Sequence, residues 1–401
     1  MSPGGERRLR TLEDLGNLTG KRTLVRCDFN VPLEGGRITD DLRIKSTLPT
    51  LIELLGRGAD LVLCSHLGRP NGKRDVRLSL SPVGARLSEL LQREVTQCGS
   101  VVGSEARHGS ERLRPGGVMM LENLRFDPRE EANDPGFADE LAALAEVYVD
   151  DAFGAAHRAH ASVVGVAERL PSAAGRLMQK EVEVLTKLRD HAAEPFVAIL
   201  GGAKVSDKLA AIDALIDRVD ALLIGGAMAF SFLAAAGGEV GRSLVEPDRY
   251  DELRVAVKKA DAKGVVIQLP EDVVAASEPA VETKRQTVRA DAIPRDLMGL
   301  DIGPRTVEEF ARTIADAETI FWNGPMGVFE LEPFSAGTRG VAQAAALAKG
   351  YSVVGGGDSL AALAKFGLRD GIEHLSTGGG ASLEFLEGRA LPGVEVLMEE
   401  A

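Results

Sequence analysis

The chain has 401 residues, of which 44% are hydrophobic and 27% are charged. This length is more than one hydrophobic core usually serves, so it predicts two domains of roughly 200 residues each and excludes a single small module. The apolar content also excludes a disordered chain. The formal net charge of −13 argues against a nucleic-acid or membrane partner, because it repels polyanions and anionic bilayer surfaces.

Charge is divided unevenly along the chain. The first 177 residues carry 24 basic and 25 acidic side chains, whereas the remainder carries 23 and 35. Of the 24 basic residues in the first part, 21 are Arg. A genome rich in Arg codons should act on both parts alike, so the alternative explanation is recognition of phosphate or carboxylate by planar guanidinium groups.

The three cysteines, Cys27, Cys64 and Cys98, form no metal-ligand spacing. Their number and placement indicate a reduced, intracellular protein, and we expect it in the cytoplasm. The basic N-terminus, MSPGGERRLRTLEDL, is not followed by an apolar stretch, so no signal peptide is expected. The uncharged run 221–238 has the length of a membrane span, but its internal Gly225-Gly226 pair predicts a strand, a turn and a buried helix.

Short apolar runs alternate with longer stretches of 3.6-residue periodicity, which is typical of strands and helices around a parallel sheet. The predicted strands are 23–27, 60–64, 117–121, 146–149, 196–200, 221–224, 265–269, 319–321, 351–354 and 374–376. Predicted helices include 42–55, 82–91, 207–217, 247–262, 307–317 and 337–349. The fold class is therefore α/β, with two doubly wound, Rossmann-like parallel-sheet domains.

A further periodic stretch, GRLMQKEVEVLTKLRD at 175–190, lies between the two sets of strands and predicts a helix that joins the domains. We expect the first domain at 1–176, the joining helix at 177–190 and the second domain at 191–390. The remaining segment, 391–401, is too short to be a unit, so it either caps the second domain or packs back on the first. A ligand cleft is expected between the two domains.

In an open parallel sheet, ligands bind beyond the carboxyl ends of the strands. In the first domain these ends carry the sequences DFN, SHLGRP, ENLRF and DDAFGAAHRAH. In the second they carry GGAKVSDK, GGAM, WNGPMGVFE, GGGDS and TGGGAS. Glycine before a helix lets backbone amides approach an anion, and the helix N-terminus adds partial positive charge. A single such loop is most simply a tight turn, but several on one sheet indicate a phosphate site.

Two lysines and one carboxylate strengthen the prediction of a nucleotide site. Lys204 and Lys208 flank a predicted helix start, and Asp358 follows three glycines, where a magnesium-bound phosphate needs a carboxylate. The known phosphate fingerprints are missing. GGAKVSDK lacks the P-loop order, and the third position of a dinucleotide fingerprint is Leu360.

The first domain offers guanidinium groups in place of glycines. Arg43, Arg69, Arg125 and Arg158 line one rim together with His66 if their strands are neighbours. Such a cluster suits a small phosphorylated carboxylate, because each oxygen can take a directed hydrogen bond. Each Arg taken alone is more simply a surface ion pair, Arg43 is the weakest candidate because it lies on a helix, and His66 could be a core histidine.

At these residues the sequence resembles the phosphoglycerate kinase family, from about Leu12 to the C-terminus. Nine motifs carry the resemblance, in the family's order: VRCDFNVP, SHLGRP, ENLRF, DAFGAAHRAHAS, LGGAKVSDK, MGLDIGP, WNGPMGVFE, GGGDS and STGGGAS. The resemblance implies that the first domain binds 3-phosphoglycerate or 1,3-bisphosphoglycerate. It implies that the second binds ADP or ATP with Mg²⁺. No counterpart is expected for the opening MSPGGERRLR.

The resemblance also assigns residues. It implies substrate binding by Asp28, Phe29, Asn30, Arg43, His66, Leu67, Gly68, Arg69, Arg125 and Arg158. It implies nucleotide binding by Lys208, Gly299, Glu330, Gly356, Gly357, Asp358 and Ser359, with Asp358 as the metal ligand. Arg43 and Lys204 are the implied catalytic residues, next to the phosphoryl group in transfer.

The chemistry of such a reaction fits a chain without an obvious base or nucleophile. Phosphoryl transfer needs positioning and cationic stabilisation, and the substrate carboxylate that attacks ATP is already ionised. Ligands on separate domains meet only when the cleft closes, so a hinge is expected in 177–190 and in the TGGGAS segment.

Two other functions remain open from the residues alone. The first is another two-domain nucleotide enzyme such as a dehydrogenase, which the failed dinucleotide fingerprint disfavours. The second is a non-catalytic two-lobed binder of small anions, which would not need Lys204, Lys208 and Asp358. A monomer is expected, because one chain supplies both sites.

Overall fold

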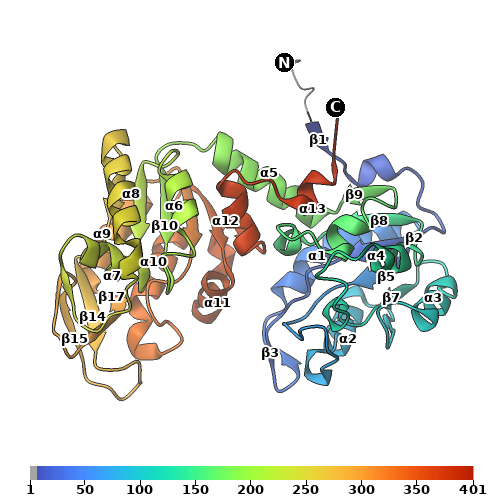
Figure 1. Cartoon of the computed structure of the whole chain (residues 1–401), viewed down its shortest axis with the longest axis horizontal. Coiled ribbons are helices and arrows are strands. Elements are labelled where there is room, and N and C mark those ends of the chain that lie inside the picture. The colour runs from blue at the N-terminus through green and yellow to red at the C-terminus, as the bar shows by residue number, and fades with distance from the viewer. Residues whose placement is uncertain (1–6, 401) are drawn as a thin grey trace. The chain divides into compact units, whose positions relative to one another are not determined.

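The computed structural model describes residues 7–400, so part of the opening MSPGGERRLR, residues 1–6, lies outside the described residues. The chain divides into two compact units (Figure 1). The first unit runs to Glu183 and also includes the segment from Ala390 onward, and the second unit is Val184–Arg389. The division falls within helix α5 (Arg176–Asp190).

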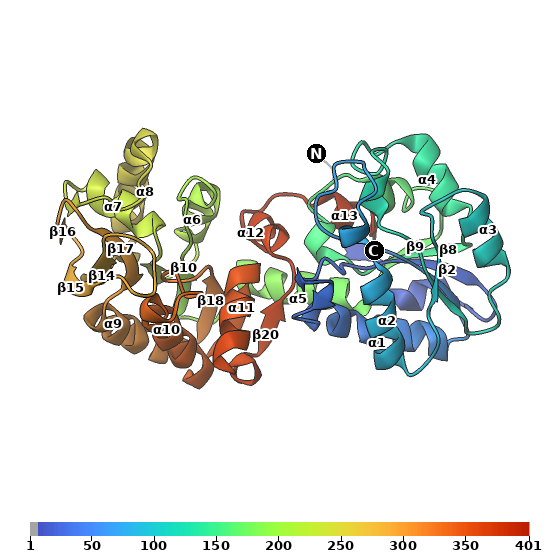
Figure 2. The ribbon, with the colours of Figure 1, turned by 90° about the horizontal axis from the view of Figure 1, so that it is seen from below.

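The first unit is built on a six-stranded sheet in the order β6-β7-β5-β2-β8-β9, in which every pair of neighbours is parallel. Its strands are β2 (Arg22–Arg26), β5 (Asp60–Cys64), β6 (Thr96–Gln97), β7 (Val118–Met120), β8 (Val147–Asp150) and β9 (Ser172–Ala174). Its helices are α1 (Leu42–Gly56), α2 (Ser81–Leu91), α3 (Ser104–Glu111) and α4 (Pro135–Ala142). Every residue of β5, β7 and β8 is buried, because helices cover both faces of the sheet. Figure 2 shows α1 and α2 on one face and α4 on the other.

The second unit repeats this plan with the parallel order β13-β11-β10-β18-β19-β20. Its strands are β10 (Phe196–Leu200), β11 (Ala221–Ile224), β13 (Val266–Gln268), β18 (Thr319–Asn323), β19 (Tyr351–Gly355) and β20 (His374–Ser376). Its helices are α6 (Leu209–Leu215), α7 (Met228–Ala235), α8 (Tyr250–Lys263), α9 (Pro304–Ala315), α10 (Ala336–Leu347), α11 (Gly357–Phe366) and α12 (Gly380–Leu386). In Figure 2, α7 and α8 lie on one face of the unit and α9 and α10 on the other.

Smaller sheets complete the two units. An antiparallel sheet of the second unit has the order β15-β14-β17, from β14 (Asp272–Ala276), β15 (Arg285–Arg289) and β17 (Met298–Ile302). Two-residue strands pair as β3 (Leu33–Glu34) with β4 (Arg37–Ile38) and as β12 (Glu239–Val240) with β16 (Ala292–Ile293). In the first unit, β1 (Arg7–Leu9) pairs with β21 (Met398–Glu400), which follows helix α13 (Pro392–Glu395).

The predicted fold class is confirmed, and all ten predicted strands form within about two residues of their expected ends. The prediction missed β6 and β9 of the parallel sheets, because β6 is two exposed polar residues and β9 has only small ones. The helix predicted at 307–317 begins earlier, at Pro304 after the N-cap Gly303, since proline favours the first position of a helix. The helix predicted at 247–262 begins at Tyr250, after a 3₁₀ turn over Pro247–Arg249.

The uncharged run 221–238 forms a strand and a buried helix, as predicted. It contains β11 and α7, and seven of the eight residues of α7 are buried. Within residues 7–400, no helix is both long and apolar enough to cross a membrane.

Candidate active site

Each parallel sheet has one point at which the strand order reverses. In the first unit the chain proceeds from β2 to β5 and β7 on one side, and then places β8 on the other side of β2. In the second unit β10 is followed by β11 and β13 on one side, and β18 lies on the other. Ligands of doubly wound sheets bind at such switch points, so we expect ligand-binding residues in the loops after β2 and β8 and after β10 and β18.

In the first unit the loop after β2 carries a buried ion pair. Asp28 is 3% exposed, and Arg43 in the first turn of α1 donates to its Oδ2. Burial acts to raise the pKa of Asp28, but the guanidinium groups of Arg43 and Arg26 oppose this and hold the pKa at about 2. The Asp28 carboxylate therefore stays ionised and fixes the position of Arg43.

The same loop is joined to the loop after β5. Gly68 N donates to Asn30 Oδ1 at 2.8 Å, and Arg125 Nη1 donates to Gly68 O at 2.9 Å. Burial, and then the neighbouring Arg158, lower the pKa of Arg125. Because like charges are held close together here, an anion bound between them would relieve their repulsion.

His66 is 6% exposed, and its Nδ1 lies 3.1 Å from Nη2 of Arg26. Burial, and then Arg26, push the pKa of His66 well below its ordinary value. Arg158 is half-buried and its Nε donates to Nε2 of His157 at 3.1 Å.

The structure therefore brings most of the predicted substrate residues into one connected group. Hydrogen bonds link Asp28, Asn30, Arg43, Gly68 and Arg125, and electrostatic interactions join His66 and Arg158 to them. Phe29 and Leu67 are buried core side chains, and their backbone amides donate to the side chains of Ser65 and Asn123. Arg69 is exposed. The condition set for a shared rim, that the strands be neighbours, is met by the order β7-β5-β2-β8.

In the second unit a cavity of about 360 Å³ lies at the switch point. Its lining comes from the loops after β10, β18 and β19: Gly201, Gly202, Ala203, Lys204, Asp207, Lys208, Asn323, Gly324, Pro325, Gly356, Gly357, Asp358 and Ser359. The predicted residues Lys204, Lys208 and Asp358 are thus brought together, with Gly356, Gly357 and Ser359 beside them.

Lys208 ties two of these loops together. Its Nζ donates to Gly201 O at 2.7 Å, to Asn323 O at 2.6 Å and to Asn323 Oδ1 at 2.7 Å. Burial lowers the pKa of Lys208 to about 8, although Asp358 and Asp207 act in the opposite direction. The Lys208 ammonium group is therefore partly removed from water, which favours the binding of an anionic group beside it.

Gly324 shows why this cavity needs glycine. Its φ is +100°, a backbone conformation that residues with a Cβ rarely adopt. A Cβ at this position would also collide with the carbonyl oxygen of Gly201 and approach Nζ of Lys208. The glycines after β10 and β18 therefore allow the two loops to pack directly on each other, a requirement more specific than that of a tight turn.

The loop after β19 leads into the N-terminus of α11. Asp358 is exposed and Ser359 is buried, and Ser359 Oγ accepts from Gly324 N at 2.6 Å. A group of three or more metal-ligating side chains is not found in residues 7–400. Mg²⁺ is commonly held by one or two carboxylates together with substrate phosphates, so the oxygens of Asp358, facing this cavity, fit that ion.

Two predicted nucleotide residues do not line this cavity. Gly299 lies on β17, where its amide donates to Ser243 Oγ at 2.9 Å and a Cβ would collide with the ring of Phe230. Glu330 is exposed, and its carbonyl accepts from Lys365 Nζ at 3.1 Å.

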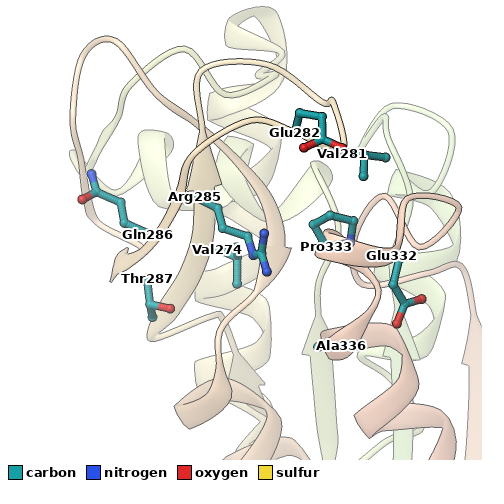
Figure 3. Close-up of a pocket in the computed structure, with 9 residues that line it drawn as sticks. All are labelled: Val274, Val281, Glu282, Arg285, Gln286, Thr287, Glu332, Pro333 and Ala336. Carbon is teal, nitrogen blue, oxygen red and sulfur yellow. The ribbon is translucent and has the colours of Figure 1, made fainter.

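A larger hollow of about 740 Å³ in the second unit lies elsewhere. Figure 3 shows its lining on β14, on β15 and its preceding loop, on the 3₁₀ turn Glu332–Phe334 and at the start of α10. It is lined by Val274, Val281, Glu282, Arg285, Gln286, Thr287, Glu332, Pro333 and Ala336. None of the predicted site residues lies in it, so its size does not identify a reaction site.

Sequence reasoning missed three residues that shape these sites. Arg26 contacts His66, Asn323 accepts from Lys208, and Glu246 Oε2 accepts from the amides of Val205 and Ser206 at 2.6 and 3.0 Å. A charged residue inside the apolar run TLVRC and a polar residue at the end of a buried strand were available signals for the first two. Glu246 is 41 residues away from the loop it holds and had no signal.

Comparison with known proteins gives one consistent family. The family model described as phosphoglycerate kinase matches residues 12–389. The chain is 56% identical to the phosphoglycerate kinase of Thermomicrobium roseum over 98% of this chain and 100% of the relative. It is 55% identical to the phosphoglycerate kinase of Thermus thermophilus, over 97% of this chain and 100% of the relative.

Solved structures agree with the sequence comparisons. The phosphoglycerate kinase of Coxiella burnetii is 41% identical with a TM-score of 0.83, over 97% of this chain and 99% of that one. The phosphoglycerate kinase of Pyrococcus horikoshii is 34% identical with a TM-score of 0.87, over 97% of this chain and 98% of that one.

Proposed function

The chain belongs to the phosphoglycerate kinase family, and from that premise we propose how its residues divide the work of the reaction. The protein transfers a phosphoryl group between 1,3-bisphosphoglycerate and ADP, giving 3-phosphoglycerate and ATP, in glycolysis. It uses ATP or ADP as a co-substrate together with Mg²⁺. The single observation that supports the residue assignment is that the loops at each switch point bring most of the predicted residues of that unit together.

In the first unit we assign 3-phosphoglycerate to the connected group around Arg125 and His66. The substrate carries a phosphate and a carboxylate, and guanidinium groups bind both by paired, charge-assisted hydrogen bonds. Asp28 and Asn30 supply acceptors for the substrate hydroxyl while they hold Arg43 and Gly68 in place. The exposed Arg69 is assigned to the substrate phosphate.

In the second unit we assign the nucleotide phosphates to the cavity after β10, β18 and β19. Lys208 exchanges one carbonyl acceptor for a phosphate oxygen, and backbone amides at the start of α11 add partial positive charge. Asp358 holds Mg²⁺, which neutralises phosphate charge when bound. Gly299 and Glu330 are assigned to the adenosine, outside this cavity.

The transfer itself needs cations at the moving phosphoryl group. Negative charge spreads over its equatorial oxygens, so Lys204 and Arg43 stabilise the transition state without a covalent intermediate. The carboxylate of 3-phosphoglycerate attacks directly in the direction that consumes ATP, because it is already ionised at pH 7.

Ligands carried by separate units must be brought together, so we propose closure about 177–190 and the TGGGAS segment. Small-angle scattering should show compaction only with both ligands bound, and unchanged curves would contradict this. We also propose that the protein acts as a cytoplasmic monomer. Sedimentation at working concentration tests the oligomeric state.

The assignment is tested by a coupled assay of the purified protein with 3-phosphoglycerate, ATP and Mg²⁺. Lys204→Ala and Arg43→Ala should each lower kcat by roughly 10² to 10³, the effect of removing one preorganised electrostatic group. Lys258→Ala and Arg305→Ala remove exposed charges elsewhere and should leave kcat unchanged. Equal losses in all four variants, or none, would contradict the assigned roles.

A further inference from the structure

A charged side chain at the end of strand β2 is completely buried. Arg26 is 0% exposed, and a guanidinium group in that position is tolerated only when its donors are satisfied. Its Nε donates to Ser162 Oγ at 2.9 Å, and its Nη1 donates to the carbonyl oxygen of Cys27. The remaining contact joins Nη2 to Nδ1 of His66 at 3.1 Å.

The other end of this chain of contacts is a buried glutamate. Glu130 is 0% exposed, and its two carboxylate oxygens accept from Oγ and N of Ser162 at 2.6 and 2.9 Å. The Ser162 hydroxyl thus uses its single proton in the hydrogen bond to Glu130, and its oxygen accepts the hydrogen bond from Arg26. Tyr148 Oη donates to the carbonyl oxygen of Ser162 at 2.6 Å and fixes the backbone of that residue.

The contact with Arg26 decides the state of the histidine. A guanidinium group has donors only, so Nδ1 of His66 must be the acceptor and cannot carry a proton. A histidine with an unprotonated Nδ1 is neutral, and its ring proton lies on Nε2. The charged groups that influence His66 besides Arg26 are Asp28, Arg43 and Arg125. Three of these four neighbours are cationic, which also opposes a charged ring.

We propose that Glu130 and Ser162 are positioning residues that hold Arg26 against His66 and thereby keep His66 in its neutral form with the proton on Nε2. His66 then gives the substrate a directed hydrogen bond without adding another positive charge to the surrounding arginines. Without the hydroxyl of Ser162, Arg26 turns toward the carboxylate of Glu130 and leaves Nδ1. The proposal rests on the proposed function only in assigning the substrate to His66.

The ring state is measured directly on the whole protein labelled with ¹⁵N-histidine. Two-bond ¹H–¹⁵N correlation spectra distinguish protonated from unprotonated ring nitrogens, and a His66→Asn variant identifies the His66 signals. The parent should show an unprotonated Nδ1 and a protonated Nε2 from pH 5.5 to 8. A protonated Nδ1, or a ring that titrates in that interval, would overturn the proposal.

The positioning role is tested with Ser162→Ala. Its matched control is Ser172→Ala, another buried serine of the first unit, whose hydroxyl donates to the backbone oxygen of Ala167 at 3.1 Å. In Ser162→Ala the His66 signals should move toward a mixture of tautomers. The KM for 3-phosphoglycerate should rise roughly tenfold to a hundredfold, the value of one hydrogen bond to a charged group, while the KM for MgATP stays within twofold. Ser172→Ala should change neither readout.

The outcomes separate this proposal from the proposed function. If the parent turns over but Ser162→Ala matches Ser172→Ala in both readouts, the positioning role is wrong. If the parent does not turn over 3-phosphoglycerate, the proposed function fails, and the spectra still decide the state of His66. Glu130→Gln keeps an oxygen acceptor for Ser162 and should therefore shift the His66 signals less than Ser162→Ala does. A larger shift in Glu130→Gln would mean that Ser162 is not the residue that holds Arg26 in place.

Discussion

The two candidate sites use different parts of the chain for the same task of holding an anion. In the first unit the polar atoms belong to side chains, and Asp28, Arg43 and Arg125 are held by ion pairs and by the carbonyl of Gly68. In the second unit the cavity is lined by glycine-rich loops, with glycine after each contributing strand and Lys208 as the link between loops. A side-chain site therefore depends on charge and burial, whereas a backbone site depends on how closely loops can approach.

Among the variants that test this difference between the two sites, Gly324→Ala should have the largest effect. The positive φ and the collision with Gly201 together should cost about 2–5 kcal/mol, which should abolish detectable ADP binding while 3-phosphoglycerate still binds. Calorimetric titration with each ligand measures both. Gly367→Ala is the matched control, since Gly367 also has a positive φ, +68°, but open space around it. Equal behaviour of the two variants would show that loop contact is not the decisive factor.

The corresponding change in the first unit is Arg125→Met, which keeps an unbranched apolar side chain but removes the guanidinium group and its charge. Arg125 is 4% exposed and donates to Gly68 O. The KM for 3-phosphoglycerate should rise roughly tenfold to a hundredfold, with the KM for MgATP unchanged. Steady-state kinetics with each substrate varied in turn measures this. A rise in both KM values would mean that the side-chain site is not confined to the first unit.

The pH dependence should also differ between the sites. Burial lowers the pKa of Lys208 to about 8, so the free protein loses this cation as the pH rises through 8. ADP affinity should then weaken by up to roughly tenfold per pH unit between pH 8 and 10. Binding of 3-phosphoglycerate, which relies on arginines that stay charged, should stay level. Calorimetry across that range measures both, and Lys208→Arg, which stays charged over the whole range, should flatten the ADP profile.

The smallest expected effect comes from Glu246, which holds the loop before Lys208 through the amides of Val205 and Ser206. Glu246→Ala should raise the KM for MgATP about fivefold, the consequence of losing roughly 1 kcal/mol of hydrogen bonding. Glu246→Gln retains an oxygen acceptor and should recover most of that loss. No difference between the two variants would assign the effect to charge and not to the positioning of the loop.

Much of the site could be predicted, because parallel strands send their carboxyl ends to one edge. The motifs after β2, β5, β7 and β8 were therefore correctly expected to meet, as were Lys204, Lys208 and Asp358. The roles of single residues were less accessible. Arg26 could be noticed as a charge in an apolar run, but its link to Ser162 and Glu130 joins residues more than a hundred positions apart in the chain.

The sequence by itself determined the α/β class, the ten main strands and the family, because alternation, strand composition and motif order are local properties. Only the tertiary structure decided where the final segment pairs, since β21 finds β1 nearly four hundred residues away. It also decided why Gly324 must be glycine and which nitrogen of His66 accepts, because both depend on contacts made when distant loops pack. The periodicity of a sequence indicates which face of a helix or strand is buried. It does not indicate which atoms of distant segments contact that face.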